Sequence, residues 1–356
     1  MTTPLRILVL GASYGSLLGT KLALAGHHVT LVCLPAEAEL INSEGAVVRM
    51  PVKGRQNLLE VNSKTLPGTL QASGPAGIVP SRFDLVALAM QEPQYGAPGV
   101  RELLAAVARA RVPVMSIMNM PPLPYLKRIP GLDTSALQSC FTDPSVWAGF
   151  DPEKFTLCSP DPQAFRPPNE PVNVLQVRLP TNFKAARFAG DADTAILTRL
   201  EHDIAEARYS AAGEAVELPV KLKVHSSIFV PMAKWAMLLA GNYRCVQADG
   251  MRAIKDAVHT DIAATRAVYE WVADLCVSLG AAPGDMVPFE KYAVAAQSLL
   301  SPSSAARALA AGAQNIERVD KLVQAVAAQK GRRLAAIDET VSLVDGWLTR
   351  NRAKAA

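Results

Sequence analysis

The stretch Gly11-Ala12-Ser13-Tyr14-Gly15 places small residues and a hydroxyl group directly after a run of apolar residues. Two kinds of chemistry fit this stretch. As G-x-S-x-G, it spells the strand-to-helix elbow that exposes a serine nucleophile in hydrolases. As a glycine-rich turn, it would let the backbone approach the pyrophosphate of a dinucleotide. The N–H groups at a helix N-terminus would then favour the anion.

The predicted elements around this turn decide between the two possibilities. Segment 5–10 is predicted to be a buried strand, 16–26 a helix and 29–33 a second strand. Together they form a parallel unit with a crossover helix. A hydrolase elbow normally follows several earlier strands, and its catalytic histidine comes later, whereas the last histidine, His259, is predicted to lie in a helix. The position therefore favours a dinucleotide-binding turn.

The composition excludes several classes of protein. The chain has 356 residues, of which 50% are hydrophobic and 19% charged, with a formal net charge of +4. Its basic residues are scattered apart from small clusters, so we expect no nucleic-acid surface. The five cysteines include no pair with the spacing of a zinc site, and we expect no bound metal. Without a signal peptide or an apolar run long enough for a membrane helix, we expect a cytoplasmic protein.

The pattern along the chain predicts two domains. Further buried strands are predicted at 84–90, 112–118 and 172–179, with a helix at 100–110. Residues 119–172 are predicted to be mostly loop. After about residue 192, alanine and leucine dominate at helical spacing, as in 268–279. We therefore predict an α/β protein, with a Rossmann-type parallel-sheet domain over residues 1–200 and an all-helical domain over residues 201–356.

The whole arrangement resembles the ketopantoate reductase family, which joins a dinucleotide-binding domain to a helical domain related to that of 6-phosphogluconate dehydrogenase. The family's opening GAGAIGSLLG corresponds to GASYGSLLG at residues 11–19, where the loop is one residue shorter. Ile117-Met118-Asn119 is similar to the family's L-Q-N. Residues 235–242 are similar to its W-x-K-L-x-x-N helix, and residues 303–312 to its S-S-M-x-x-D-x-x-x-G segment.

The resemblance implies that the keto group of a 2-oxo acid is reduced with NADPH, while a lysine ammonium polarises the carbonyl oxygen and supplies the proton. The family's lysine position holds Met237 here, and its asparagine position holds Gly241. Lys234, one helical turn earlier, and Asn242 are our candidates for those roles. The other candidate catalytic residues are Asn119, Ser303 and Glu317.

Asn119 and Ser303 also have structural alternatives, and Glu317 is one residue away from the expected position. Asn119 could hold the nicotinamide or a substrate hydroxyl, or it could cap the end of a strand. Ser303 could contact the substrate, or it could cap a helix after Pro302. Glu317 lies one step from Ile316, which stands in the place of the family's glutamate.

The predicted cofactor contacts are Gly11, Ala12, Ser13, Tyr14, Gly15, Ser16, Leu34, Met90, Gln91, Gln94 and Asn119. Leu34 stands where the family often has an arginine for the 2′-phosphate of NADP. No acidic residue suited to NAD takes that place, and Glu37 and Glu39 follow in a predicted helix. The cofactor is therefore NADP or NAD, and the family resemblance favours NADPH.

The lead hypothesis is an NAD(P)-dependent oxidoreductase that acts on a 2-oxo acid or related carbonyl other than ketopantoate, since the residues that differ are the chemical ones. Lys221, Lys223 and Arg244 could pair with a carboxylate on this small-molecule substrate. Two alternatives stay open. One is an opine-dehydrogenase-type imine reductase assisted by His225 or His259, and the other is a noncatalytic dinucleotide-binding or sensor protein. The resemblance also implies a homodimer.

Overall fold

The structure, a computed structural model, describes residues 3–355 and divides into two compact units. The first unit contains the residues up to Met90, Gln94–Met118 and Val146–Ser226. The second contains Gln91–Pro93, Asn119–Ser145 and the residues from Ser227 onward. The boundary predicted at residue 200 falls inside a helix of the first unit, and a strand that follows this helix also belongs to that unit's main sheet.

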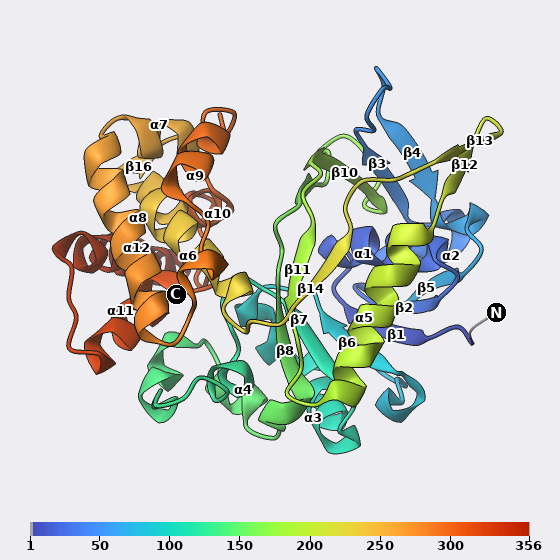
Figure 1. Ribbon diagram of the computed structural model, residues 1–356, viewed down its shortest axis with the longest axis horizontal. Helices are drawn as coiled ribbons and strands as arrows, with labels where there is room; N and C mark the ends of the chain where they lie inside the picture. Colours follow the sequence, from blue (N-terminus) through green and yellow to red (C-terminus); the bar gives the residue numbers. More distant parts are fainter. Residues whose placement is uncertain (1–2, 356) are drawn as a thin grey trace. The chain divides into compact units, whose positions relative to one another are not determined.

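An eight-stranded sheet forms the centre of the first unit (Figure 1), with the order β14-β11-β8-β7-β6-β1-β2-β5. Every neighbouring pair is parallel except β8 and β11. The strands are β1 (Arg6–Leu10), β2 (His28–Val32), β5 (Thr69–Ser73), β6 (Leu85–Leu88), β7 (Val114–Ile117), β8 (Phe155–Ser159), β11 (Phe183–Ala186) and β14 (Leu222–His225). The predicted parallel-sheet fold is therefore confirmed.

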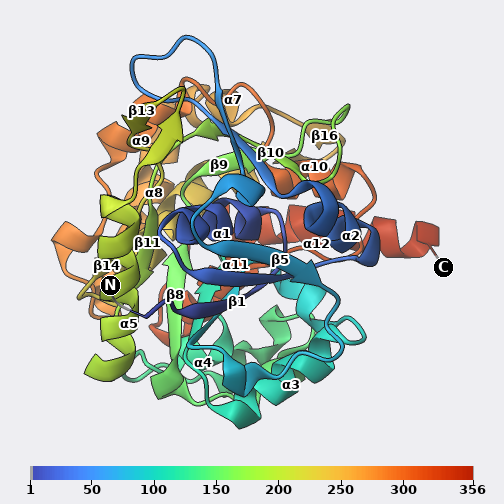
Figure 2. The same ribbon diagram turned by 90° about the vertical axis from the view of Figure 1, so that its right-hand side faces the viewer.

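Helices cover both faces of this sheet. α1 (Tyr14–Leu24) connects β1 to β2 on one side, whereas α3 (Val100–Ala110) connects β6 to β7 on the other (Figure 2). Because both faces are covered, the β1 residues Ile7 to Leu10 are fully buried. The unit also contains α2 (Pro35–Glu44) and α5 (Asp191–Glu206). This is a doubly wound arrangement, which binds ligands at the carboxyl ends of its strands.

Smaller sheets complete the first unit. One has the order β4-β3-β10-β9, and β12 pairs with β13. Their bounds are β3 (Val47–Met50), β4 (Leu59–Asn62), β9 (Gln163–Phe165), β10 (Val174–Leu179), β12 (Tyr209–Ala211) and β13 (Glu214–Val216). The prediction that 119–172 is mostly loop was wrong for β8 and β9. The prediction of an all-helical chain after residue 200 was wrong for β12, β13 and β14, which are too short for their alternation to stand out.

The second unit is mainly helical. It contains α4 (Leu123–Leu126), α6 (Lys234–Met237), α7 (Ile254–His259), α8 (Ile262–Ser278), α9 (Phe289–Ala296), α10 (Ser304–Ala310), α11 (Val319–Gln329) and α12 (Ala335–Ala355). A two-stranded pair, β15 (Val246–Gln247) and β16 (Gly250–Met251), interrupts it. Directly after α6 comes a π-helical turn, Leu238–Asn242. Among residues 3–355, no helix is long and apolar enough to cross a membrane.

Short 3-10 helices connect the larger elements. They are Ser63–Thr65, Pro80–Arg82, Glu92–Gly96, Ser135–Cys140, Pro144–Trp147, Pro152–Lys154, Val230–Ala233, Tyr243–Cys245 and Pro283–Asp285. The predicted apolar stripe of 268–279 lies in and just after α8, where most of its members are buried. Trp271 alone of that stripe is partly exposed.

A buried lysine fixes the position of α1. Lys21 is 2% exposed, and its ammonium donates hydrogen bonds to the carbonyl oxygens of Leu218 (3.0 Å) and Pro219 (3.1 Å). These carbonyls belong to the segment between β13 and β14. Burial, together with the positive charge of Lys221, lowers the pKa of Lys21 to about 7. The helix that follows the glycine-rich turn is therefore tied to a segment almost 200 residues later.

We expect this lysine to make stability rise with pH. Between pH 7 and its ordinary pKa, the unfolded chain binds a proton at Lys21 that the folded chain does not bind, so raising the pH favours folding. From pH 7 to pH 9 the free energy of unfolding should rise by about 2 kcal/mol more in the native chain than in Lys21→Met. Urea unfolding at both pH values measures this difference, and equal pH dependence in the two proteins would contradict it.

Candidate active site

The turn between β1 and α1 has the backbone that a pyrophosphate site needs. Gly11 has a φ of +103°, and a Cβ at this position would lie 2.6 Å from Met90 Cγ and 2.8 Å from Ala89 O. Only glycine therefore fits where the end of β1 packs against the end of β6. The N-terminus of the eleven-residue α1 follows at once, with N–H groups and a positive dipole end suited to an anion.

Side chains on either side of this turn are held by specific contacts. Ser16 is buried, and its hydroxyl donates to Ala12 O at 2.5 Å. Tyr14 donates its hydroxyl hydrogen to Pro162 O at 3.0 Å. Pro162 lies between β8 and β9, so the β8–β9 connection is held at the start of α1. Ser16 and Tyr14, both predicted cofactor contacts, thus also shape the turn.

The end of β6 is held by a tyrosine that sequence reasoning missed. The hydroxyl of Tyr95 accepts a hydrogen bond from Met90 N (3.0 Å) and donates one to Met90 O (3.3 Å). Tyr95 is fully buried and packs edge-on against Trp147. Gln91 and Gln94, the other predicted contacts after this strand, are exposed. A tyrosine five residues after Met90 is the only signal the sequence offered.

The end of β2 carries an ion pair between a buried carboxylate and a partly exposed guanidinium. Leu34 is exposed at the start of α2, as expected for a residue that could meet a ligand. Glu37, in the first turn of α2, is buried, and its carboxylate pairs with the guanidinium of Arg166, which directly follows β9. Burial raises the pKa of Glu37, and Arg166 opposes that rise. Arg166 was missed because it lies 129 residues from Glu37 in the sequence.

Three predicted catalytic residues meet in the second unit. The side-chain amide of Asn119 forms a hydrogen bond with the carboxyl group of Glu317, and Lys234 is near enough for its charge to lower the pKa of that carboxyl. The backbone N–H of Glu92 donates to Glu317 Oε1 at 3.4 Å. Glu92, Asn119, Lys234 and Glu317 come from widely separated segments, and we call these four residues the Glu317 cluster.

The Glu317 carboxyl is placed to exchange a proton near neutral pH. Burial raises its pKa to about 7, and the nearby Glu92 carboxylate raises it as well. The Glu92 N–H, the Asn119 amide and the Lys234 charge act in the opposite direction. A carboxyl group with this pKa is suited to general acid–base chemistry.

Glu92 is a buried carboxyl group near Glu317 that sequence reasoning did not select. It is 2% exposed, and it accepts hydrogen bonds from Thr142 N (3.0 Å) and Thr142 Oγ1 (2.9 Å). Burial raises its pKa, and the two bonds from Thr142 oppose the rise. Thr142 therefore holds Glu92 so that its backbone N–H reaches Glu317.

Asn119 has an atom available for a ligand. Its Oδ1 is buried and accepts no hydrogen bond from any of residues 3–355. A buried acceptor without a donor is costly unless a ligand or water supplies one. A carboxamide N–H or a hydroxyl group would satisfy it, so the Asn119 side chain fits both a nicotinamide and the alcohol of a hydroxy acid.

The other two candidates contact each other rather than the Glu317 cluster. Ser303 is 2% exposed, and its hydroxyl donates to Asn242 O at 2.6 Å. The same hydroxyl accepts from Ala306 N at 3.2 Å and thereby caps α10. Ser303 therefore caps α10, as its structural alternative predicted. Its hydroxyl also holds the backbone of Asn242 in place.

The hydroxyl of Tyr292 fills the space beside Gly241, the residue predicted to stand at the family's asparagine position. The Tyr292 hydroxyl donates to Met237 O at 3.1 Å, and any Cβ at position 241 would collide with that hydroxyl. Gly241 lies in the π-helical turn, a distortion that often accompanies functional sites. The family's side chain cannot fit at this position unless Tyr292 moves.

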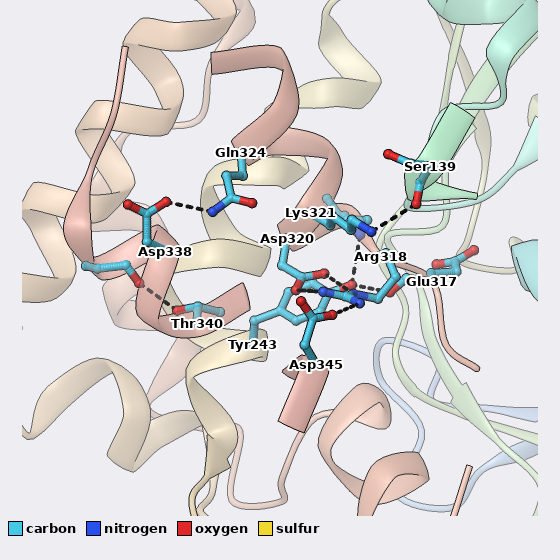
Figure 3. A network of polar contacts seen from close by, with 12 residues as sticks. Ser139, Tyr243, Glu317, Arg318, Asp320, Lys321, Gln324, Asp338, Thr340 and Asp345 are labelled. Atoms are coloured by element: carbon cyan, nitrogen blue, oxygen red, sulfur yellow. Dashed lines mark hydrogen bonds and ion pairs between the residues drawn. The ribbon is translucent and has the colours of Figure 1, made fainter. Parts of the chain in front are cut away.

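A network of polar contacts fixes the backbone on both sides of Glu317 (Figure 3). The hydroxyl of Tyr243 donates to Glu317 O and accepts from Val319 N (3.1 Å). Arg318, which lies between Glu317 and Val319 in the chain, pairs with Asp320 at 2.9 Å and with Asp345 at 2.5 Å. Asp320 is fully buried, so this ion pair is costly to break.

The basic residues predicted to bind a substrate carboxylate have partners within the protein. Lys221 pairs with Glu217, and Lys223 pairs with Glu201 at 3.3 Å, both in the first unit. Arg244 donates to Thr265 Oγ1 at 2.6 Å in the second. The two histidines considered for an imine reductase are likewise divided: His225 lies in β14, whereas His259 ends α7.

No family model matches the chain, and no curated protein matches it in sequence. Solved structures do match it over nearly its whole length. One is 2-dehydropantoate 2-reductase from Methylococcus capsulatus, with a TM-score of 0.64, 15% identity and coverage of 98% of both chains. Another is D-mandelate dehydrogenase with NADH and anilino(oxo)acetate, with a TM-score of 0.64, 14% identity and coverage of 98% of this chain and 99% of the other.

A ketopantoate reductase of the PanE/ApbA family from Ralstonia eutropha JMP134 has a TM-score of 0.61 and 16% identity, and the match covers 98% of this chain and 99% of the other. At such low identity, these matches establish the architecture rather than the reaction. The protein therefore has the fold of the ketopantoate reductases and of D-mandelate dehydrogenase.

Proposed function

We propose that this protein is an NAD(P)-dependent oxidoreductase that reduces the keto group of a 2-oxo acid or a related carbonyl compound. The observation that carries the proposal is the Glu317 cluster, in which a partly buried carboxyl group, an amide and a lysine meet. The glycine-rich turn at Gly11 adds a site suited to a dinucleotide pyrophosphate. The fold, shared with reductases and dehydrogenases, agrees with this chemistry.

Each group of the cluster has a task in this proposal. When bound, a nicotinamide cofactor would supply the hydride for the carbonyl carbon. The ammonium group of Lys234 polarises the carbonyl oxygen and gives it a proton, which yields the hydroxyl group. The Glu317 carboxyl then returns a proton to the neutral Lys234 amine, and Asn119 Oδ1 accepts a hydrogen bond from the ligand.

The homodimer implied by the resemblance stays a prediction.

A substrate survey tests the proposed reaction directly. Titration with NADPH and NADH, followed by fluorescence, should show binding of at least one of them below millimolar concentration. With 2-oxo acids of differing side chains, including ketopantoate and benzoylformate, absorbance at 340 nm should fall as the cofactor is oxidised. Failure to bind either dinucleotide would remove the proposal, and binding without turnover of any carbonyl would favour the noncatalytic alternative.

Replacing Lys234 tests the proton donor. Without its ammonium group, the developing alkoxide loses both its positive charge and its proton source, so Lys234→Ala should lower kcat by at least about 10²-fold. Lys255→Ala is the matched control, because Lys255 is an exposed lysine of the same unit, in α7. An unchanged rate in Lys234→Ala would exclude this residue from the role.

The pKa of Glu317 predicts a pH dependence. The protonated carboxyl is the form that resupplies Lys234, so kcat for reduction should fall as the pH rises through about 7. Glu317→Gln should lower the rate and abolish this limb of the pH profile. Glu339→Gln, at an exposed position of α12, should leave the profile unchanged. A limb near pH 7 that persists in Glu317→Gln would assign the titration to another group.

Tyr243 acts on this site only through the backbone of Glu317. Tyr243→Phe leaves Glu317 O and Val319 N without their partner, which should cost about 1–3 kcal/mol of stability and shift the pH limb. Tyr269→Phe is a matched control, since the buried Tyr269 hydroxyl donates to Val287 O at 2.7 Å. Both variants should unfold more easily in urea, but only Tyr243→Phe should change the pH profile. If the two profiles match, Tyr243 has a purely structural role.

A further inference from the structure

The structure places the side chain of an arginine, Arg166, at the end of β2, although the residues that directly follow β2 in the sequence include no basic residue. In Rossmann folds, the region just after the second strand meets the 2′-position of the adenosine ribose. Here that region contains Leu34 and Glu37, and neither can pair with a phosphate. The guanidinium of Arg166, which follows β9, reaches this region and pairs with the Glu37 carboxylate.

Exposure decides which member of the pair meets a ligand. The Arg166 side chain is 35% exposed, whereas that of Glu37 is 9% exposed. A ligand at the end of β2 therefore meets the positive charge. Arg166 uses Nη2 for Glu37, and within residues 3–355 no acceptor is paired with its Nε or Nη1. An arginine with one edge fixed and its other donors available is suited to bind a phosphate group.

The segment that carries Arg166 is held at several points. Pro162 O accepts the hydrogen bond from Tyr14 at the start of α1. Phe165 pairs with Gln176 in the β9–β10 sheet, and the guanidinium of Arg178 lies over the Phe165 ring at 4.9 Å. Arg166 is thus presented by a fixed strand, and Glu37 orients its side chain. Pre-organisation of this kind lowers the entropy lost on binding.

Leu34 adds an apolar surface to the same region. It is 74% exposed, the largest exposed fraction among the large apolar side chains of residues 3–355. It precedes α2, three residues before Glu37. An exposed leucine at the same end of β2 as the Glu37–Arg166 pair suits a ligand that has an apolar ring and an anionic group, as an adenosine 2′-phosphate has.

We infer that Arg166 binds the 2′-phosphate of NADPH and selects it over NADH, with Glu37 as the residue that positions its guanidinium. This inference rests on the proposed function only in requiring that the first unit binds a nicotinamide dinucleotide. Arg166 is then the specificity-determining residue that replaces an arginine at position 34.

Binding measurements test the inference without any turnover. By isothermal titration, the native protein should bind NADPH at least about tenfold more tightly than NADH, and adenosine 2′,5′-bisphosphate more tightly than adenosine 5′-phosphate. Arg166→Gln should abolish both preferences while leaving NADH affinity within about twofold. Arg55→Gln is the matched control, because this arginine of the same unit also pairs with a glutamate, Glu214 at 3.0 Å, and it should keep both preferences.

A second variant removes the effect of leaving Glu37 unpaired. In Arg166→Gln/Glu37→Gln both charges are absent, so the buried site holds no isolated carboxylate, and the preference for NADPH should still be lost. If the native protein binds neither dinucleotide, the proposed function itself fails. If it binds NADPH preferentially and both Arg166 variants keep that preference, or if the native protein prefers NADH, the inference about Arg166 is overturned while the proposed function stands.

Discussion

Partial removal of the Glu317 carboxyl from water is the constraint on which the candidate site depends. A carboxyl group removed from water is stable only if neighbours supply hydrogen bonds or charge. The Asn119 amide, the Glu92 N–H and the charge of Lys234 supply them, from three separate segments of the chain. The backbone that carries Glu317 must also be fixed, and the contacts of Tyr243 and the buried Arg318–Asp320 pair do so. The chemistry of one residue thus dictates how several elements of the second unit are held.

Buried charges organise the first unit in the same way. Lys21 bonds to carbonyl groups of Leu218 and Pro219, and Glu37 pairs with Arg166. In each case an element of the first forty residues is tied to a segment from beyond residue 160. These contacts fix α1 and the start of α2, the two helices that follow β1 and β2. The geometry around a predicted pyrophosphate turn therefore depends on long-range partners as well as on its own glycine.

Local patterns made much of the fold predictable. The β1–α1–β2 unit, β6, α3, β7 and the stripe of α8 each carry a periodicity or a stop signal within a few residues. β8, the five residues Phe155–Ser159, carries none, because it is buried on all sides and mixes polar with apolar residues. In the site, the resemblance selected Asn119, Lys234 and Glu317, and the structure brings these three together. Glu92, Tyr95 and Arg166 were missed because their relevance arises only from tertiary contacts.

The two main departures from the pattern of the family that the sequence resembles have the same physical explanation. Gly241, predicted to stand at the family's asparagine position, leaves room for the Tyr292 hydroxyl, and a lysine one turn before Met237 lies close to the partly buried Glu317. At the position of the family's arginine stands Leu34, and Arg166 reaches the same end of β2 from a different strand. In both cases the expected basic residue is missing from its position in the sequence, at Met237 or Leu34, and another basic residue, Lys234 or Arg166, lies nearby in space. Because electrostatic interactions depend on distance and burial rather than on sequence order, such a site can differ at each chemical position and still present a cation to an anionic ligand.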